Sequence, residues 1–140
     1  MMATYNLNFR GYWIDSHKNG LPEGSGIYLV YKCVYKENIR KVSLRELVYI
    51  GQANNLKTRI DTHDKREKFL QDCVAGETIC YSIAEIPQKD LDIVESALIF
   101  MQNPKFNERK CDVFNYDTTE LHLEGRCGLM KYVDFKISNE

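Results

Sequence analysis

The chain has 140 residues, of which 44% are hydrophobic and 11% aromatic, enough apolar material for the core of one domain. A formal net charge of −1 at pH 7 excludes the broad basic surface of a histone-like protein. We therefore expect a single globular domain over residues 1–140, in which any contact with a polyanion is local. Basic residues gather in residues 31–46, and acidic residues predominate in residues 112–140.

The cysteine pattern gives no sign of a disulfide framework or a zinc site. Five cysteines are an odd number, and they show neither C-x-x-C nor Cys/His ligand spacing. We expect them to be reduced in a cytoplasmic protein. The chain opens without a basic-then-apolar leader, and no apolar run approaches the ~18 residues that a membrane helix needs, so we expect no membrane contact. The cysteines are Cys33, Cys73, Cys80, Cys111 and Cys127.

The first half of the chain carries the pattern of three strands. Residues 5–9 alternate between apolar and polar side chains, which is typical of a half-buried strand. Residues 26–36 are rich in β-branched and aromatic side chains, and after a turn at residues 37–38 the apolar pattern returns through residues 39–50. These two runs predict a long antiparallel hairpin. Each carries a tyrosine close to a glycine, in Gly-Ile-Tyr ending at Tyr28 and in Tyr-Ile-Gly starting at Tyr49.

A helix is expected directly after the hairpin. An asparagine at 54 or 55 can cap a helix that begins near Leu56 and continues through a charged middle until Gly76. Arg59 and His63 are four residues apart, so a continuous helix would place both on one face.

The second half predicts another strand, a buried helix and a closing hairpin. Residues 77–86 read as a strand, and an apolar stripe at helical spacing follows from Gln88, with Glu95 inside it. Residues 120–124 and 132–137 alternate around a glycine-containing turn, and this hairpin could extend the sheet or pair with residues 5–9. We expect an α+β fold in which a small antiparallel sheet of three central strands, in a β-β-α-β-α core, is flanked by helices and widened by terminal strands.

Taken together, these residues resemble the GIY-YIG endonuclease family. The two tripeptides correspond to its name-giving motifs, Arg59 and His63 follow at family spacing, and Glu95 occupies its metal-ligand position. The sequence Pro-Lys-Phe-Asn that ends at Asn107 is similar to its terminal signature. The resemblance covers about residues 24–109 and leaves residues 110–140 as a C-terminal β extension. It implies a nuclease site made of Tyr28, Tyr49, Arg59, His63 and Glu95, with Gly51, Lys57 and Asn107 as substrate-binding residues.

The implied chemistry is hydrolysis of DNA phosphodiester bonds by in-line attack of water. Glu95 would bind one divalent ion, Mg²⁺ or Mn²⁺, because such ions accept few protein carboxylates and keep several waters. Arg59 would bind the scissile phosphate with its planar fork. Tyr28 would accept the proton of the water, although forming a phenolate at pH 7 costs roughly 4 kcal/mol unless cations offset it. Alternatively, His63 is the base and Tyr28 only relays a hydrogen bond.

Two other functions remain open on the sequence. The chain could be a catalytically inactive module of the same fold that binds nucleic acid or regulates a partner, or it could be a protein-interaction domain. Cleavage or binding of DNA at low salt separates these possibilities, because phosphate contacts are strongest there. DNA is the expected partner and no small-molecule cofactor is expected, while sequence specificity would come from the hairpin or the C-terminal segment.

Overall fold

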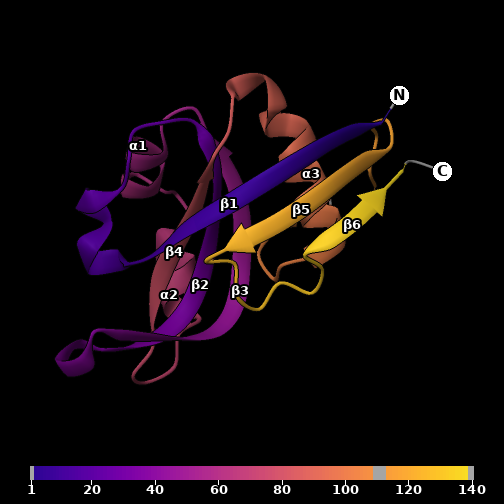
Figure 1. Cartoon of the computed structure of the whole chain (residues 1–140). Coiled ribbons are helices and arrows are strands. Elements are labelled where there is room, and N and C mark those ends of the chain that lie inside the picture. Colours follow the sequence, from indigo (N-terminus) through magenta and orange to yellow (C-terminus); the bar gives the residue numbers. More distant parts are fainter. Residues whose placement is uncertain (1, 109–112, 139–140) are drawn as a thin grey trace.

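A computed structural model describes residues 2–108 and 113–138 of the chain, and it has an α+β fold built on one six-stranded sheet. Most of the expected elements are present (Figure 1). The expectation for Cys111 lies outside the described residues, whereas the other four cysteines are free. The elements are β1 (Ala3–Ile14), η1 (Asp15–Gly20), β2 (Gly26–Lys36), η2 (Glu37–Ile39), β3 (Lys41–Ala53), α1 (Leu56–Asp61), α2 (Arg66–Gln71), β4 (Thr78–Glu85), η3 (Gln88–Asp90), α3 (Leu91–Gln102), β5 (Thr119–Gly125) and β6 (Asp134–Ile137).

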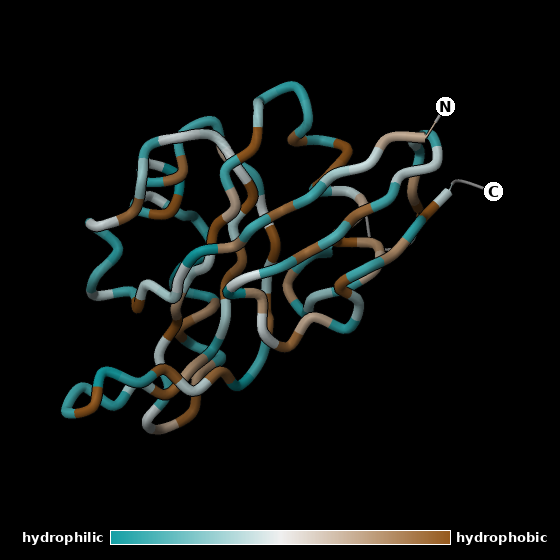
Figure 2. Tube along the Cα trace, viewed as in Figure 1, coloured by the Kyte–Doolittle hydropathy of each residue, from teal (hydrophilic) through white to brown (hydrophobic). Residues whose placement is uncertain are grey.

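The sheet is larger than the three central strands that we expected, and it is mixed. The strand order is β3-β2-β4-β1-β5-β6, and every neighbouring pair is antiparallel except β1 and β5. Strand β1 runs past residue 9 to Ile14 and pairs there with β4, and a bulge between Gly11 and Trp13 shifts its register. The parallel partner of its first half is β5, so the closing hairpin both extends the sheet and pairs with residues 5–9. Figure 2 shows the alternation of hydrophilic and hydrophobic residues along β5.

Two hydrophobic clusters cover the two faces of the sheet. Strand β2 contributes to both, with Leu29 in the cluster beneath α3 and Val30 in the cluster beneath α1 and α2. The cluster under α3, which we call the α3-side core, also includes the inner face of β5 and β6. The cluster under α1 and α2 is called the α1/α2-side core. Because β3 is an edge strand, side chains from both faces can meet beside it.

The helix expected from Leu56 to Gly76 is broken in the middle. Residues 62–65 are not helical, so His63 follows α1 instead of lying in it. Thr62 is the C-cap of α1, where its backbone is no longer helical, and its hydroxyl donates to the carbonyl of Thr58. The predicted cap is confirmed at the other end, where the Asn55 side chain accepts from the backbone N–H of Thr58. Among the described residues, no helix has the length and apolarity to cross a membrane.

Candidate active site

The glycines of both tripeptides permit close packing around Tyr28. Gly51 lies opposite Tyr28 in the β2–β3 ladder, and a Cβ atom at this position would overlap the phenol ring. Gly26 lies so close to the backbone of Ala84 on β4 that it also has no room for a side chain. In this structure Gly51 therefore makes space for the Tyr28 ring, which is a packing role beside the substrate-binding role expected from the sequence.

A bulge in the hairpin directs Tyr49 toward the same side as Tyr28. The register shifts between Val30 and Tyr31, so that Val48 faces no residue across the ladder. As a result both Val48 and Tyr49 pack on the α1/α2-side core. The rings of Tyr28 and Tyr49 are 6.2 Å apart between centroids, which confirms that the two tyrosines converge. Tyr28 is buried, at 1% exposure, whereas Tyr49 is only partly buried.

His63 joins the tyrosines from the loop between α1 and α2. Its Nε2 atom lies 2.7 Å from the phenol oxygen of Tyr28, and its Nδ1 atom accepts a hydrogen bond from the backbone N–H of Lys65 at 3.1 Å. Burial, together with the positive charge of Arg59, lowers the pKa of His63 to about 4. The imidazole is therefore neutral at pH 7. Because Nδ1 is an acceptor, the single proton is on Nε2, and His63 donates to Tyr28.

Arg59 lies close to both phenols. Burial raises the pKa of Tyr28 and of Tyr49, and the Arg59 guanidinium opposes this effect through its charge and through side-chain hydrogen bonding. Arg59 also forms an ion pair with Asp64 at 3.1 Å, in which the Asp64 side chain is 71% exposed. Another anion can easily replace Asp64 as the partner of Arg59, because surface ion pairs contribute little free energy.

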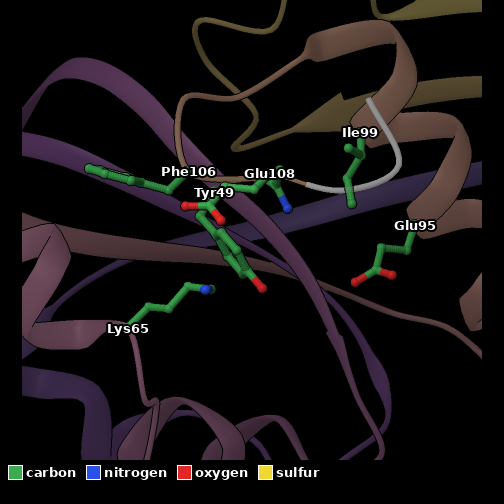
Figure 3. Close-up of a pocket in the computed structure, with 7 residues that line it drawn as sticks. Tyr49, Lys65, Glu95, Ile99, Phe106 and Glu108 are labelled. Atoms are coloured by element: carbon green, nitrogen blue, oxygen red, sulfur yellow. The ribbon is translucent and has the colours of Figure 1, made fainter. Parts of the chain in front are cut away.

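Glu95 reaches the site from the opposite face of the sheet. It lies on α3, is 7% exposed, and lines a cavity of about 330 Å³ together with Tyr49 and Lys65. In Figure 3 the Tyr49 phenol, the Lys65 amine and the Glu95 carboxylate point toward a common space. The side-chain amide of Gln52, from the end of β3, donates to Glu95 at 3.0 Å and to Asp92 at 2.8 Å.

The donor chemistry of this cavity suits a hard divalent cation. The residues that line it include two carboxylates, Glu95 and Glu108, and the phenol of Tyr49. Mg²⁺ prefers such oxygen ligands, and it usually keeps several waters beside one or two carboxylates. Among the described residues, no group of three or more His, Cys, Asp or Glu side chains could hold a metal ion together. Of the two carboxylates that line this cavity, Glu95 is the one that the sequence predicts as the ligand of a cation.

Asn107 binds the backbone of the second tripeptide. Its carboxamide oxygen accepts from the N–H of Ile50 and its amide nitrogen donates to the carbonyl of Ile50, each at 2.9 Å. With the bond from Phe106 N–H to the carbonyl of Val48, these contacts fix residues 104–107, which we call the edge segment, along β3. Asn107 also lines the cavity, so the structural role coexists with the substrate contact expected of it.

Lys57 differs from the other two expected substrate-binding residues, since Gly51 packs on Tyr28 and Asn107 lines the cavity. It is on α1, where its backbone N–H donates to the carbonyl of Pro22, and it is not among the described residues that line the cavity. The cavity instead presents Lys65, which sequence reasoning assigned to a solvated helix face. The helix break places Lys65 beside His63 and at the cavity. The contact of Gln52 with Glu95 was also not predicted from the sequence. Gln52 directly follows the Tyr-Ile-Gly tripeptide, and this position indicates that it lies near the site.

Comparisons of this chain with protein-family models, with curated proteins and with solved structures found no significant match.

Proposed function

We propose that the chain is a divalent-metal-dependent endonuclease that hydrolyses phosphodiester bonds in DNA. One observation carries this proposal: five side chains of the expected types, from separate elements, converge beside one cavity. They are Tyr28, Tyr49, Arg59, His63 and Glu95. The resemblance of their spacing to the GIY-YIG endonucleases supports the same activity.

Arg59 is the candidate ligand of the scissile phosphate. Its guanidinium offers a planar fork of donors, which matches a phosphate better than a lysine amine does. Its exposed partner Asp64 can be exchanged for the phosphate at little cost, because both groups remain accessible to water. Lys65 adds a second cation to the cavity wall, so that charge developing on the phosphoryl oxygens would be neutralised from two directions.

Glu95 is the candidate metal ligand, with Gln52 orienting its carboxylate. When bound, a divalent ion would stabilise charge on the phosphoryl oxygens and favour ionisation of the neighbouring phenols. Hydrogen bonds to ligating carboxylates hold them in position, so Gln52 would act on the metal through Glu95.

The hydrogen bonds of His63 favour a phenol over the imidazole as the proton acceptor. Both ring nitrogens are engaged, and the nitrogen that faces Tyr28 carries the proton. His63 would then stabilise a Tyr28 phenolate by donating to it, together with the charge of Arg59. In this proposal Tyr28 accepts the proton of the attacking water, and Tyr49, which lines the cavity, orients that water.

The proposal is tested by incubating the full chain with supercoiled, linear, branched and flap DNA, with Mg²⁺, with Mn²⁺ and with EDTA. We expect metal-dependent cleavage of at least one substrate, and its loss in Glu95→Gln. Asp92→Asn is a matched control, because Asp92 lies on the same helix and contacts the same Gln52 but does not line the cavity. Equal cleavage by wild type and Glu95→Gln would refute the role of Glu95. Binding of DNA without cleavage under every condition would favour an inactive nucleic-acid-binding module.

A further inference from the structure

A second hollow lies along the same edge of the sheet as the candidate active site. Its volume is about 380 Å³, and its walls come from three parts of the chain. Strand β3 contributes Arg45 and Leu47, the edge segment contributes Lys105, and the connection between β5 and β6 contributes Leu129 and Lys131. We call it the basic hollow.

Gln102 at the end of α3 fixes the far wall of the basic hollow. Its side chain is nearly inaccessible, at 2% exposure. Its carboxamide oxygen accepts from the backbone N–H groups of Lys131 and Tyr132 at 2.7 and 3.2 Å, and its amide nitrogen donates to the carbonyl of Tyr132 at 2.6 Å. The connection that carries Lys131 is thereby attached to the helix, so the backbone of Lys131 is held at the rim of the hollow.

The charge of the basic hollow is positive and largely uncompensated. Lys105 forms an ion pair with Asp72 at 2.7 Å, and the wall carboxylate of Glu46 is engaged by Lys32 at 3.0 Å. Within residues 2–108 and 113–138, no ion pair involves the side chain of Arg45 or of Lys131. Two such cations beside one hollow are a local exception in a chain whose net charge is −1.

The basic hollow adjoins the candidate active site along the edge segment, because consecutive residues of this segment line the two. Lys105 belongs to one hollow, and its neighbours Phe106 and Asn107 belong to the other. A chain of phosphates that follows this edge would pass from one to the other. We propose that the basic hollow binds a backbone phosphate of the DNA strand that flanks the scissile bond, an inference that rests on the proposed function.

The basic hollow would hold the sugar-phosphate backbone of the DNA and would not contact the bases. Arg45 would fork onto the phosphate and Lys131 would approach it as a point charge. Leu47 and Leu129 offer apolar walls for a sugar. Such contacts fix the register of the strand without reading its sequence, so the contribution to affinity is electrostatic and falls with salt.

The test is a salt titration of DNA affinity by fluorescence anisotropy, using labelled duplex DNA in EDTA so that binding is measured without cleavage. The double variant Arg45→Gln, Lys131→Gln is compared with Lys89→Gln, Lys136→Gln, which removes the same charge from exposed positions away from the hollow. We expect the slope of log affinity against log salt to become shallower by about 1, the value for one lost phosphate contact, only in the first variant. All four replaced side chains are exposed, and unchanged circular dichroism melting confirms that each variant is folded.

Equal slopes in wild type and in the hollow variant would overturn the proposal, as would an equal decrease in the control. The two proposals can fail separately. A chain that never cleaves DNA could still show a shallower slope in the hollow variant than in wild type, which would support the basic hollow without the nuclease activity. Cleavage by wild type with no difference in slope would refute the basic hollow alone. If wild type does not bind DNA at low salt, both proposals fall.

Discussion

At the scale of single residues, the contacts of His63 determine what the neighbouring groups can do. A histidine that accepts at Nδ1 and donates at Nε2 has no lone pair left to take a proton from water. Burial keeps it neutral, so its effect on Tyr28 is that of a fixed hydrogen-bond donor. This arrangement predicts a pH dependence for stability as well as for activity.

The stability of the chain should fall between pH 6.5 and pH 4 because of His63. Its pKa is lowered from 6.5 to about 4, so in this window the unfolded chain binds a proton that the folded chain does not. The contribution is fully present above pH 6.5 and is lost as the pH decreases, by up to about 3 kcal/mol. Urea unfolding at pH 7 and pH 4.5 measures this change in the free energy of unfolding. The change should be smaller in His63→Gln, and an identical change in both proteins would contradict the assignment.

Tyr28→Phe should reduce cleavage at least about 100-fold without unfolding the domain. The substitution removes the phenol oxygen and keeps the ring that packs on Gly51, whereas loss of a general base typically costs 10²–10⁴-fold. Tyr49→Phe is the comparison, and a smaller loss is expected from it. Single-turnover cleavage from pH 6 to 9 should also rise in wild type, because the phenol must lose its proton before it can act as the base, whereas a His63 base with a pKa of about 4 would give a flat rate in this range. A rate that is independent of pH from 6 to 9, or a greater loss in Tyr49→Phe than in Tyr28→Phe, would exclude Tyr28 as the base.

Residue types and spacing were enough to predict that Tyr28 and Tyr49 converge, but not what each one contacts. Tyr28 and Tyr49 could be paired from the hairpin pattern alone, because antiparallel strands bring such positions together. The bidentate bond of Asn107 with Ile50 could not be predicted, because it depends on where the edge segment crosses β3. Lys65 was missed for a similar reason, since its position follows from a helix break of a few residues.

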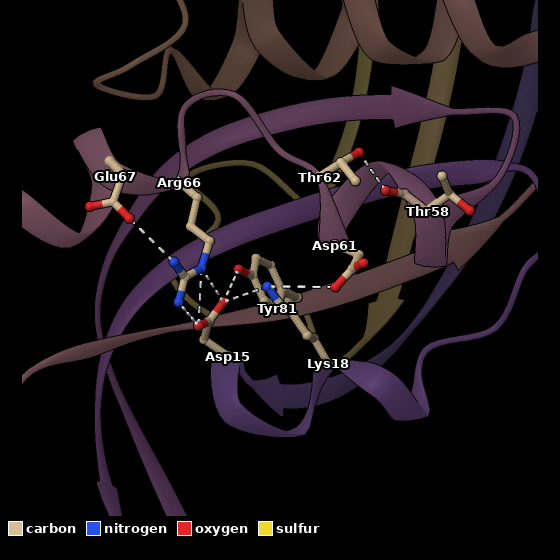
Figure 4. A network of polar contacts seen from close by, with 8 residues as sticks. All are labelled: Asp15, Lys18, Thr58, Asp61, Thr62, Arg66, Glu67 and Tyr81. Carbon is tan, nitrogen blue, oxygen red and sulfur yellow. Dashed lines mark hydrogen bonds and ion pairs between the residues drawn. The ribbon is translucent and has the colours of Figure 1, made fainter.

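At the scale of elements, a buried carboxylate ties η1 to α2 and β4. Asp15 accepts hydrogen bonds from the guanidinium of Arg66, the shortest at 2.6 Å, and from the Tyr81 hydroxyl at 2.5 Å (Figure 4). Lys18 lies 3.9 Å from Asp15 and 3.8 Å from Asp61. Because Arg66 is the first residue of α2, this network also holds the end of the loop that carries His63.

Asp15→Asn should destabilise the chain by about 2 kcal/mol at pH 7, since hydrogen bonds to charged groups are lost. Burial raises the pKa of Asp15, but the bonds from Arg66 and Tyr81 outweigh it and leave the pKa below the ordinary value. The stabilisation is therefore present above pH 4 and disappears as the pH falls through the lowered pKa. Chemical denaturation at pH 7 and pH 3 measures the difference between wild type and variant, which should be smaller at pH 3.

Asp61→Asn is the matched control for this network, because Asp61 is 58% exposed and, among the described residues, forms an ion pair with Lys18 alone, at 3.8 Å. It should cost less than about 0.5 kcal/mol. An equal loss of stability in Asp15→Asn and Asp61→Asn would mean that the network contributes nothing beyond surface charge.

The broken helix shows why element boundaries were harder to predict than element types. The charged run after Asp61 fits an exposed helix face as well as a turn, since neither places apolar residues in that stretch. The choice is made by side-chain bonds to the backbone, from Thr62 to Thr58 and from Lys65 to His63. Hydrophobic periodicity carries no information about such bonds, whereas it located β2, β4 and α3 well.

At the scale of the whole molecule, the terminal strands turn a small antiparallel sheet into a mixed one with two cores. The alternation of apolar and polar residues predicted β5 and β6. It did not predict which strand they pair with, because every exposed sheet edge offers the same backbone groups. The parallel pairing with β1 brings Leu121 and Phe135 into the α3-side core, next to residues of the hairpin. Residues 113–138 thus form part of the core that supports α3 and Glu95.

This arrangement predicts that both cores unfold together. Leu121 is fully buried in the α3-side core, so Leu121→Ala should cost about 2–5 kcal/mol. Val133→Ala, at a 41% exposed position in the same segment, should cost less than about 1 kcal/mol. Trp13 is the only tryptophan, and it packs on the α1/α2-side core, so its fluorescence reports on the opposite face of the sheet. If the domain is one cooperative unit, Leu121→Ala lowers the midpoint of Trp13 fluorescence and of far-ultraviolet circular dichroism by the same amount. A fluorescence midpoint that stays at the wild-type value while the dichroism midpoint falls would show two independently folding units.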